Sequence, residues 1–389
     1  MTPYWIFFIS FAALTLFASP YSLSSKKNLE YREIFYLDLF KAACVIILVI
    51  FIGFRFEVGG DWINYKDIYF DLVNQELSDS IQISTDPFFG FINWIAGQFY
   101  LWDSSAYGSL RWNMNQDFHG YILVNIITAI LFSIGLIKFC FDLPRPMLAI
   151  VVATPYLITV VSMGYVRQAA SLGLIMYGFS YLKDNNLRNF VLLSLLAALI
   201  HKASLIMLPM AIFISTKNRL LILFAIGFLS IISGIILLES YIERVYQHYI
   251  NEGLSSSGAI FRLGMLVPPS LIYLYYQSKF DLNDSLIKLW RLFSIASIVL
   301  FLMLFFTNFS TFIDRIALFF LPLQMVVFSY LPNFFTKKMT GLIILSIVAY
   351  SALVLFVWLN FADNAWAWVP YENILFLEQS EISYKVRDR

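Results

Sequence analysis

Long runs of apolar residues, separated by short polar links, recur along almost the whole chain. A run of about 17 or more such residues can cross the hydrocarbon core of a bilayer as an α-helix. We therefore predict an all-α polytopic membrane protein with about ten to twelve transmembrane helices plus re-entrant or interfacial segments, for which a GT-C-like arrangement is one model. The predicted spans are Tyr4–Tyr21, Tyr36–Phe54, Tyr121–Ile137, Pro146–Ser162, Gly164–Tyr181, Leu220–Leu238, Arg262–Tyr276, Trp290–Thr307, Phe312–Leu331 and Thr340–Leu359.

Two apolar stretches do not fit a simple crossing. Pro87–Tyr100 is too short to span comfortably, so it is predicted to be an interfacial or re-entrant helix. Asn189–Ser215 is long enough but is interrupted by His201, Lys202 and Ser204. It is predicted either as two half-length helices that meet at a polar tip or as one long interrupted helix.

The polar stretches divide this single integral membrane domain, residues 1–389, between two sides of a membrane. Lysine and arginine are enriched in cytoplasmic links. When the Lys26–Lys27 link is placed inside and the two irregular stretches do not cross, most basic links fall in the cytoplasm. Residues 55–120 then form a periplasmic loop region with an interfacial helix, residues 239–261 a periplasmic loop and residues 360–389 a polar C-terminal tail.

Composition supports a lipid solvent and excludes several functional classes. Hydrophobic residues make up 60% of the chain and charged residues 13%, and the mean hydropathy is +0.75. Soluble domains carry about 25% charged residues. The net charge of +1 and the lack of a basic run give no reason to expect nucleic acid. We interpret Cys44 and Cys140, in or beside apolar runs, as packing residues.

No familiar catalytic motif is present. The chain has no metal-ligand spacing, P-loop, dinucleotide fingerprint or nucleophile elbow. No metal and no cofactor is therefore predicted, and an ATP-driven pump and a hydrolase with a familiar motif are both disfavoured.

Four arginines stand at the mouths of predicted helices, and the predicted topology puts them on one face: Arg55, Arg167, Arg262 and Arg315. Grouped cations at a membrane repel one another unless an anion is present, and the guanidinium fork suits phosphate. A phosphate or diphosphate pocket is therefore one interpretation. The alternative is that each arginine reaches lipid headgroups or pairs with a nearby acid. Gln168 beside Arg167 favours the first interpretation at that position.

Two residues are candidate bases. Asp61 follows the paired glycines Gly59 and Gly60, and it is predicted to be a base, an arginine partner or the cap of a local turn. His201 stands beside Lys202 in an apolar run. A general base, a phosphate ligand and a hydrogen-bonded packing histidine are the three interpretations of His201.

An ordered set of short motifs resembles a known family. The motifs are Gly-Phe-Arg-x-x-x-Gly-x-Asp-x-x-x-Tyr (Gly53–Tyr65), Val-Arg-Gln (Val166–Gln168), Leu-Ile-His-Lys-Ala-Ser (Leu199–Ser204), Asp-Arg-Ile-Ala (Asp314–Ala317) and Trp-Val-Pro-Tyr-Glu-Asn (Trp368–Asn373). Their order and spacing, over most of the chain, resemble the EpsG-like branch of the Wzy-type polysaccharide polymerases. The polar insert at residues 101–120 has no counterpart in that pattern.

The resemblance implies a glycosyltransferase that joins undecaprenyl-diphosphate-linked oligosaccharide repeat units at the periplasmic face of the bacterial inner membrane. The implied partners are the lipid-linked glycan donor and acceptor, membrane lipids and, as a further candidate, a chain-length regulator. The residues implied to bind the diphosphate are Arg55, Arg167, Gln168, Lys202, Arg262 and Arg315. Asp61 and His201 are the implied candidates for the base, and Arg167 is implied to stabilise the leaving group.

Two other classes remain as alternatives. A transporter or flippase of lipid-linked glycans also needs cations near a diphosphate, but such proteins are commonly built from internal repeats, and none is found here. A membrane acyltransferase usually carries a histidine within a reactive motif, which the pair His201–Lys202 matches only weakly.

Overall fold

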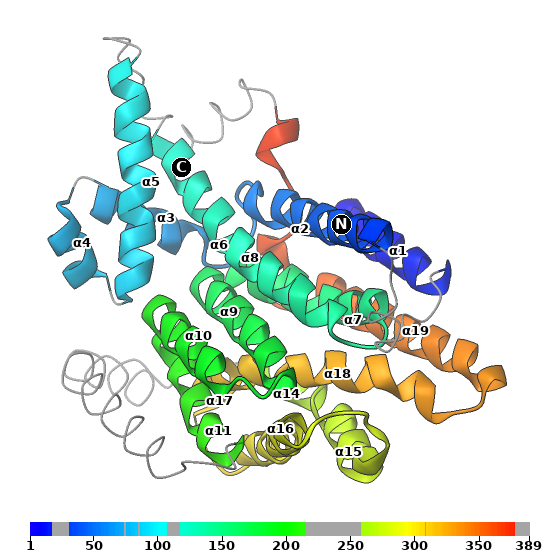
Figure 1. Cartoon of the computed structure of the whole chain (residues 1–389). Coiled ribbons are helices and arrows are strands. Elements are labelled where there is room, and N and C mark those ends of the chain that lie inside the picture. Colours follow the sequence, from blue (N-terminus) through cyan, green and yellow to red (C-terminus); the bar gives the residue numbers. More distant parts are fainter. Residues whose placement is uncertain are drawn as a thin grey trace.

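The structure, a computed structural model, describes residues 1–17, 31–73, 75–84, 86–106, 117–214, 258–307 and 309–377 (Figure 1). Within these ranges the regular elements are helices, and the β pairing is one isolated bridge between Arg55 and Asn373. The α-helices are α1 (Thr2–Phe17), α2 (Tyr31–Gly53), α3 (Trp62–Val73), α4 (Leu77–Ile83), α5 (Pro87–Ala106), α6 (Asp117–Phe141), α7 (Pro146–Ala153), α8 (Ser162–Gly164), α9 (Val166–Lys183), α10 (Leu187–Ile200), α11 (Met207–Ile214), α14 (Ala259–Gly264), α15 (Val267–Tyr276), α16 (Asp284–Met303), α17 (Ser310–Ala317), α18 (Pro322–Tyr330) and α19 (Lys337–Phe361).

Several helical stretches are long and apolar enough to cross a membrane, which confirms an all-α polytopic membrane protein. In the described part of the chain there are six: Arg32–Gly53, Gly120–Phe141, Pro146–Gly164, Ala259–Lys279, Asp284–Met303 and Lys337–Phe361. Ser310–Phe320 and Pro322–Phe334, bent by 42° at their junction, make a seventh if they form one span. The predicted span Leu220–Leu238 and most of the predicted loop 239–261 lie outside the described residues, so the predicted total stays a prediction.

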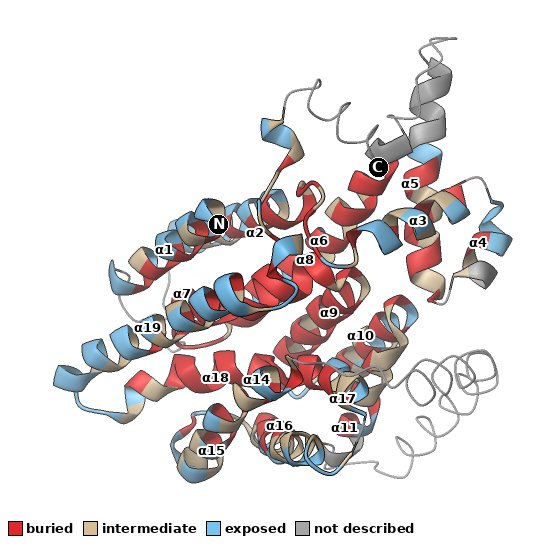
Figure 2. Cartoon of the chain, turned by 180° about the vertical axis from the view of Figure 1, so that it is seen from behind, coloured by how far each residue is buried: buried red, intermediate tan, exposed pale blue. Residues whose placement is uncertain are grey.

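The centre of the bundle is formed by α7, α9 and α18. Every residue of α7 and α18 is buried, and Figure 2 shows continuous buried surface along these helices and most of α9. Helices that are apolar on every side belong in such an interior. At the contact between α6 and α9, a Cβ atom on Gly135 would lie 1.8 Å from the carbonyl oxygen of Gly173. Only small residues permit this approach, which is typical of packed membrane helices.

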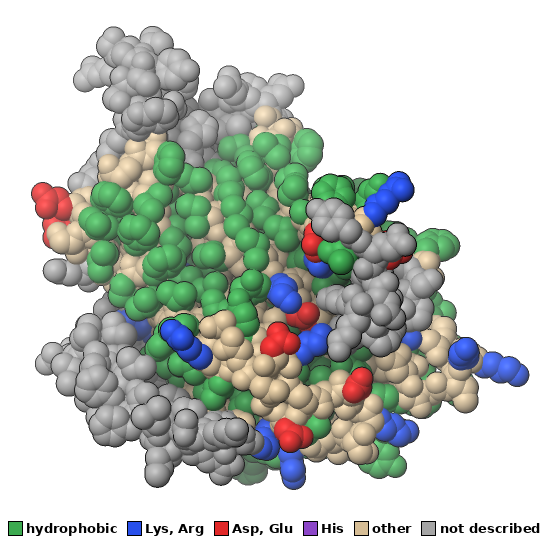
Figure 3. All heavy atoms as spheres, viewed as in Figure 1, with side chains coloured by type: hydrophobic (Ala, Val, Ile, Leu, Met, Phe, Trp, Pro, Cys, Tyr) green, Lys and Arg blue, Asp and Glu red, His purple; other side chains and the backbone are tan. Residues whose placement is uncertain are grey.

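The outer helices turn apolar side chains away from the protein. The exposed large apolar residues include Ile46, Ile47 and Ile50 on α2 and Leu342, Leu345, Leu353 and Phe356 on α19. In Figure 3 hydrophobic side chains cover much of the upper part of the face shown, and charged side chains gather in its lower and right-hand parts. An apolar outer surface of this kind requires contact with lipid, because in water it would be an aggregation surface.

The irregular segments differ in detail from the predicted ones. α10 ends at Ile200, His201 is extended (φ −152°, ψ 111°), and a 3₁₀ turn, η3 (Lys202–Ile206), leads into α11. This is the first of the two predicted alternatives, two short helices that meet at a polar tip. α5 continues to Ala106, beyond the predicted end at Tyr100.

Candidate functional site

Arg167 lies in the first turn of α9. Its Nη1 atom is 2.6 Å from Oδ2 of Asp86, the residue that precedes α5. Its Cζ atom is 5.5 Å from the ring centre of Tyr65 and 5.6 Å from that of Phe89. A carboxylate and two aromatic rings therefore hold the guanidinium group.

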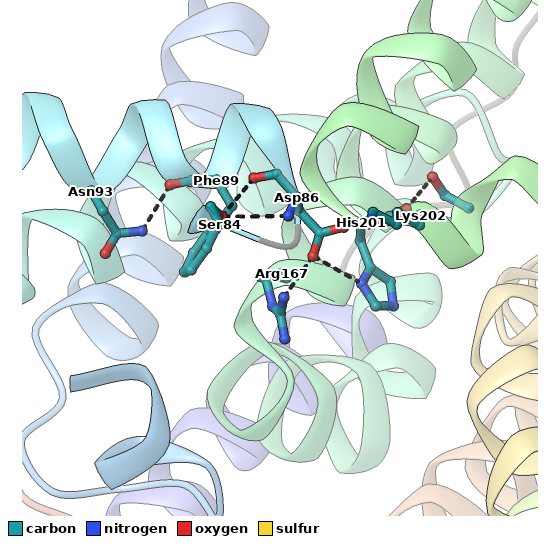
Figure 4. Close-up of polar contacts among 8 residues, drawn as sticks. Ser84, Asp86, Phe89, Asn93, Arg167, His201 and Lys202 are labelled. Carbon is teal, nitrogen blue, oxygen red and sulfur yellow. Dashed lines mark hydrogen bonds and ion pairs between the residues drawn. The ribbon is translucent and has the colours of Figure 1, made fainter. Parts of the chain in front are cut away.

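The Asp86 carboxylate links Arg167 to the polar tip (Figure 4). Its Oδ1 atom accepts a hydrogen bond from the backbone N–H of Lys202 at 3.1 Å, and its Oδ2 atom lies 4.0 Å from Nδ1 of His201. The side chain is only 4% exposed, so these donors compensate a buried charge. We call Asp86, Arg167, His201 and Lys202 the Asp86 cluster.

His201 is held as a neutral ring. Burial lowers the pKa of His201 to about 4; Asp86 opposes this shift, and Arg167 and Arg315 add to it. Its two ring nitrogens are shielded, and neither has a hydrogen-bond partner among the described residues. Its ring stacks on Phe319 with centroids 6.4 Å apart. At neutral pH one of the two nitrogens is therefore available to accept a proton.

A second arginine–carboxylate pair joins α14 to α17. Nη1 of Arg262 lies 2.9 Å from Oδ2 of Asp314 and 3.5 Å from the hydroxyl of Tyr165. The neighbouring residue, Arg315, is exposed. Gln168 donates from Nε2 to the carbonyl oxygen of Arg315 at 2.7 Å, which ties α9 to α17 directly below this arginine.

Asp61 interacts electrostatically with residues of the Asp86 cluster and of the segment around the Arg262–Asp314 pair. Burial raises the pKa of the Asp61 carboxyl, while Arg315 and Arg167 lower it. Tyr165 interacts electrostatically with both Asp61 and Arg262. The structure thus places Asp61 and His201 near three of the four predicted helix-mouth arginines: Arg167, Arg262 and Arg315.

Arg55 has different surroundings. Its side chain is fully buried and donates to the carbonyl oxygens of Ile52 (2.6 Å) and Val58 (3.0 Å) and to Oδ1 of Asn125 (2.9 Å). Its Cζ atom lies 5.5 Å from the centre of the Trp62 ring. These partners come from α2, the loop after it, α3 and α6, so Arg55 fixes the path of the loop that leads to Asp61.

The same loop is held from the other side by residues 362–377, which we call the strap. Backbone N–H groups of Phe56 and Gly59 donate to the carbonyls of Glu372 (3.0 Å) and Ala367 (2.8 Å). Gly59 has φ +116°, and a Cβ atom there would lie 2.2 Å from the carbonyl oxygen of Met163. Only glycine fits this turn. The described part of the predicted polar tail is therefore a packed element that positions Asp61.

The described residues contain no group of three or more His, Cys, Asp or Glu side chains that could hold a metal ion. The site combines four cationic residues with three carboxylates, a balance that suits an anionic ligand: Arg167, Lys202, Arg262 and Arg315 beside Asp61, Asp86 and Asp314.

The sequence was then compared with known proteins. A family model described as the EpsG family matches residues 38–101 and 104–373, well over half of the chain. The chain belongs to the EpsG family. The EpsG family is a family of Wzy-like polysaccharide polymerases, as the resemblance implied. Comparisons with curated proteins and with solved structures gave no significant match.

Two carboxylates of this EpsG family site were not assigned from the sequence. Asp86 stands directly before Pro87, a pattern typical of a helix N-terminus, so it gave no functional signal. Asp314 belongs to the Asp-Arg-Ile-Ala motif, but the motif alone predicts no role for its carboxylate. A signal for both carboxylates was nevertheless present. A buried guanidinium in a membrane protein requires an acceptor, so each buried arginine predicts a nearby acceptor such as a carboxylate.

Proposed function

We propose that this EpsG family chain is a glycosyltransferase that polymerises oligosaccharide repeat units carried on undecaprenyl diphosphate. We place the reaction at the periplasmic, outer face of the bacterial inner membrane. The observation that carries the proposal is the meeting of Arg167, Arg262 and Arg315 with Asp61 and His201 at helix ends. A lipid-diphosphate leaving group requires cations, and an acceptor hydroxyl requires a base.

Each arginine has a different role in binding the diphosphate. Arg315 is exposed, and no ion pair of its side chain is seen in the described ranges, so it makes the first contact. Arg167 and Arg262 are held by carboxylates and complete the site when the diphosphate competes for them. Lys202 adds positive charge at the tip, and Gln168 fixes the backbone of Arg315. Arg55 acts indirectly, through the loop that carries Asp61.

The proposed reaction is a direct glycosyl transfer. The acceptor hydroxyl oxygen bonds to the anomeric carbon of the donor glycan, and the bond from that carbon to the diphosphate oxygen breaks. His201 or Asp61 takes the hydroxyl proton. The arginines neutralise the negative charge that develops on the departing diphosphate, which is the main catalytic contribution expected of such a site. The donor is already activated, so no nucleotide takes part.

The proposal is tested with purified protein in liposomes and a synthetic undecaprenyl-diphosphate-linked repeat unit. We expect a ladder of glycan lengths from the unaltered chain and little or none from Arg315→Ala. Arg291→Ala is the matched control. Arg291 is also an exposed arginine, but it lies on α16, which carries none of the proposed site residues. Equal activity of both variants would contradict the assigned role of Arg315.

The lipid-linked glycans of cells that lack the gene provide a second test. A polymerase leaves single repeat units exposed at the outer face of the membrane, because export precedes polymerisation. Trapping of these units on the cytoplasmic side would instead identify a flippase and overturn the proposal.

A further inference from the structure

Asp86 joins three segments that lie far apart in the sequence. Its carboxylate contacts Arg167 in α9 and the backbone N–H of Lys202 at the tip between α10 and η3. The Oδ2 atom that lies 2.6 Å from Arg167 is also 4.0 Å from Nδ1 of His201 (Figure 4). One oxygen atom therefore faces both Arg167, which we propose binds the diphosphate, and His201, which we propose as a base.

The charges around His201 make this sharing important. The imidazole interacts with Asp86 from the start of α5, Arg167 from α9 and Arg315 from α17, and Lys202 follows it in the chain. Asp86 favours a proton on the ring, and the two arginines oppose one. A bound diphosphate neutralises the arginines and competes with Asp86 for Arg167. Both changes favour a hydrogen bond between Asp86 and His201.

We propose that Asp86 is a positioning residue that passes from Arg167 to His201 when the lipid-diphosphate donor binds. Without donor, Asp86 aligns the guanidinium of Arg167. With donor, the diphosphate takes Arg167, and Asp86 accepts a hydrogen bond from Nδ1–H of His201. This fixes the tautomer in which Nε2 accepts the proton of the acceptor hydroxyl. Loose contacts of this kind in a ligand-free site commonly tighten in the reactive complex.

The step balances as an ordinary transfer. The acceptor oxygen forms its bond to the anomeric carbon, the diphosphate leaves with the electron pair of the broken bond, and the proton moves to Nε2. The base is thus complete only when the leaving group is in place. Nε2 is shielded from solvent in the donor-free protein, so the site does not expose this base to water before a donor binds.

This inference rests on the proposed function, and one property separates it from a purely structural role. If Asp86 only ties α5, α9 and the tip together, its removal destabilises the protein but leaves the response of His201 to donor unchanged. If Asp86 passes to His201, the removal abolishes most of that response.

The experiment follows the titration of His201 directly. The chain has three histidines, so His119→Gln with His248→Gln leaves one, which selective ¹³C-histidine labelling makes visible by NMR in micelles. The probe is undecaprenyl diphosphate. We expect it to raise the pKa of His201 by about one unit or more, because an opposite charge comes within hydrogen-bonding distance. In Asp86→Asn we expect most of this rise to be lost.

Asp314→Asn is the matched control. It breaks the other arginine–carboxylate pair of the site, but Asp314 is not among the charged groups that act on His201. We expect weaker donor binding with the pKa rise preserved. Asp86→Glu, which keeps a carboxylate on a longer stem, is expected to retain part of the rise and is measured if Asp86→Asn does not fold.

The outcomes separate the two levels of the argument. An unaltered chain that binds no undecaprenyl diphosphate overturns the proposed function. An unaltered chain that binds it, with an equal rise in the pKa of His201 in Asp86→Asn, overturns the role of Asp86 and leaves the proposed function standing. A larger rise in Asp86→Glu than in Asp86→Asn shows that a carboxylate at this position produces the response, and equal rises in the two variants contradict the proposal.

Discussion

Arg55 and Arg167 both stand at helix ends, but they are satisfied by different kinds of group. Arg55 is 1% exposed and donates to backbone and amide oxygens. The Arg167 side chain is 22% exposed and is held by the Asp86 carboxylate. Neutral oxygens of the fold offer a ligand nothing to replace, whereas a carboxylate can be displaced by another anion. We therefore expect an arginine of the first kind to stabilise the fold and one of the second kind to bind an anionic ligand.

The largest expected effect in the region of Arg167 comes from His201→Gln. Glutamine keeps a hydrogen-bonding group but cannot take a proton at neutral pH. If His201 is the base, turnover falls by about 10²–10⁴-fold, the usual contribution of one general base. The measurement is glycan polymerisation by purified protein, with donor binding as the control. Nearly normal polymer from this variant moves the role to Asp61, and Asp61→Asn then carries the same expectation.

Arg167→Lys tests whether geometry as well as charge matters. Lysine keeps the positive charge but loses the planar fork that binds a phosphate through two hydrogen bonds. We expect turnover to fall by about 10²–10³-fold, comparable to the loss of one donor that stabilises developing charge. Single lipid-linked repeats should accumulate in cells while protein levels stay normal. If lysine restores full activity, the bidentate contact is not required.

Arg55→Lys should show the opposite pattern. Lysine has fewer N–H donors than arginine, all on one nitrogen. It therefore leaves buried oxygens of Ile52, Val58 or Asn125 unpaired, at a cost of about 1–3 kcal/mol for each. We expect a lower melting temperature in micelles, with turnover per folded molecule reduced far less than in Arg167→Lys. A stable but inactive Arg55→Lys protein would place Arg55 in the site and break the comparison.

The smallest effect on turnover per folded molecule is expected in the loop that Arg55 holds. Gly59→Ala forces a side chain into a left-handed turn and against the Met163 carbonyl, which costs about 1–3 kcal/mol for the backbone strain alone. Gly60→Ala is the matched control, since its Cβ atom would make an ordinary contact, 3.5 Å from the Trp368 ring. Melting temperatures of the two variants should differ clearly. Equal values would show that the close approach to the Met163 carbonyl does not constrain the loop.

The sequence predicted the parts of this protein that follow from local pattern. Apolar run lengths predicted the helical membrane fold. Polar residues within an apolar run predicted the tip at His201 as one of two alternatives, because such residues interrupt burial in a predictable place. The roles of Arg55 and Arg167 could not be separated in this way, since their partners lie on other helices. Asp86 gave no functional signal in the sequence, because an aspartate before a proline is explained by the helix that follows it.

The strap also affects how the chain is assembled during synthesis. The loop at residues 54–61 emerges from the ribosome early, but the backbone groups that hold it belong to Ala367, Glu372 and Ile374, made some three hundred residues later. Chains are produced from the N-terminus onward, so the earlier helices can insert and pack before the strap is available. The loop therefore waits without its final partners while the bundle forms. Docking of the strap must wait until residues 362–377 have been made, so nascent chains that stop before it carry every proposed catalytic residue but lack the backbone partners of this loop.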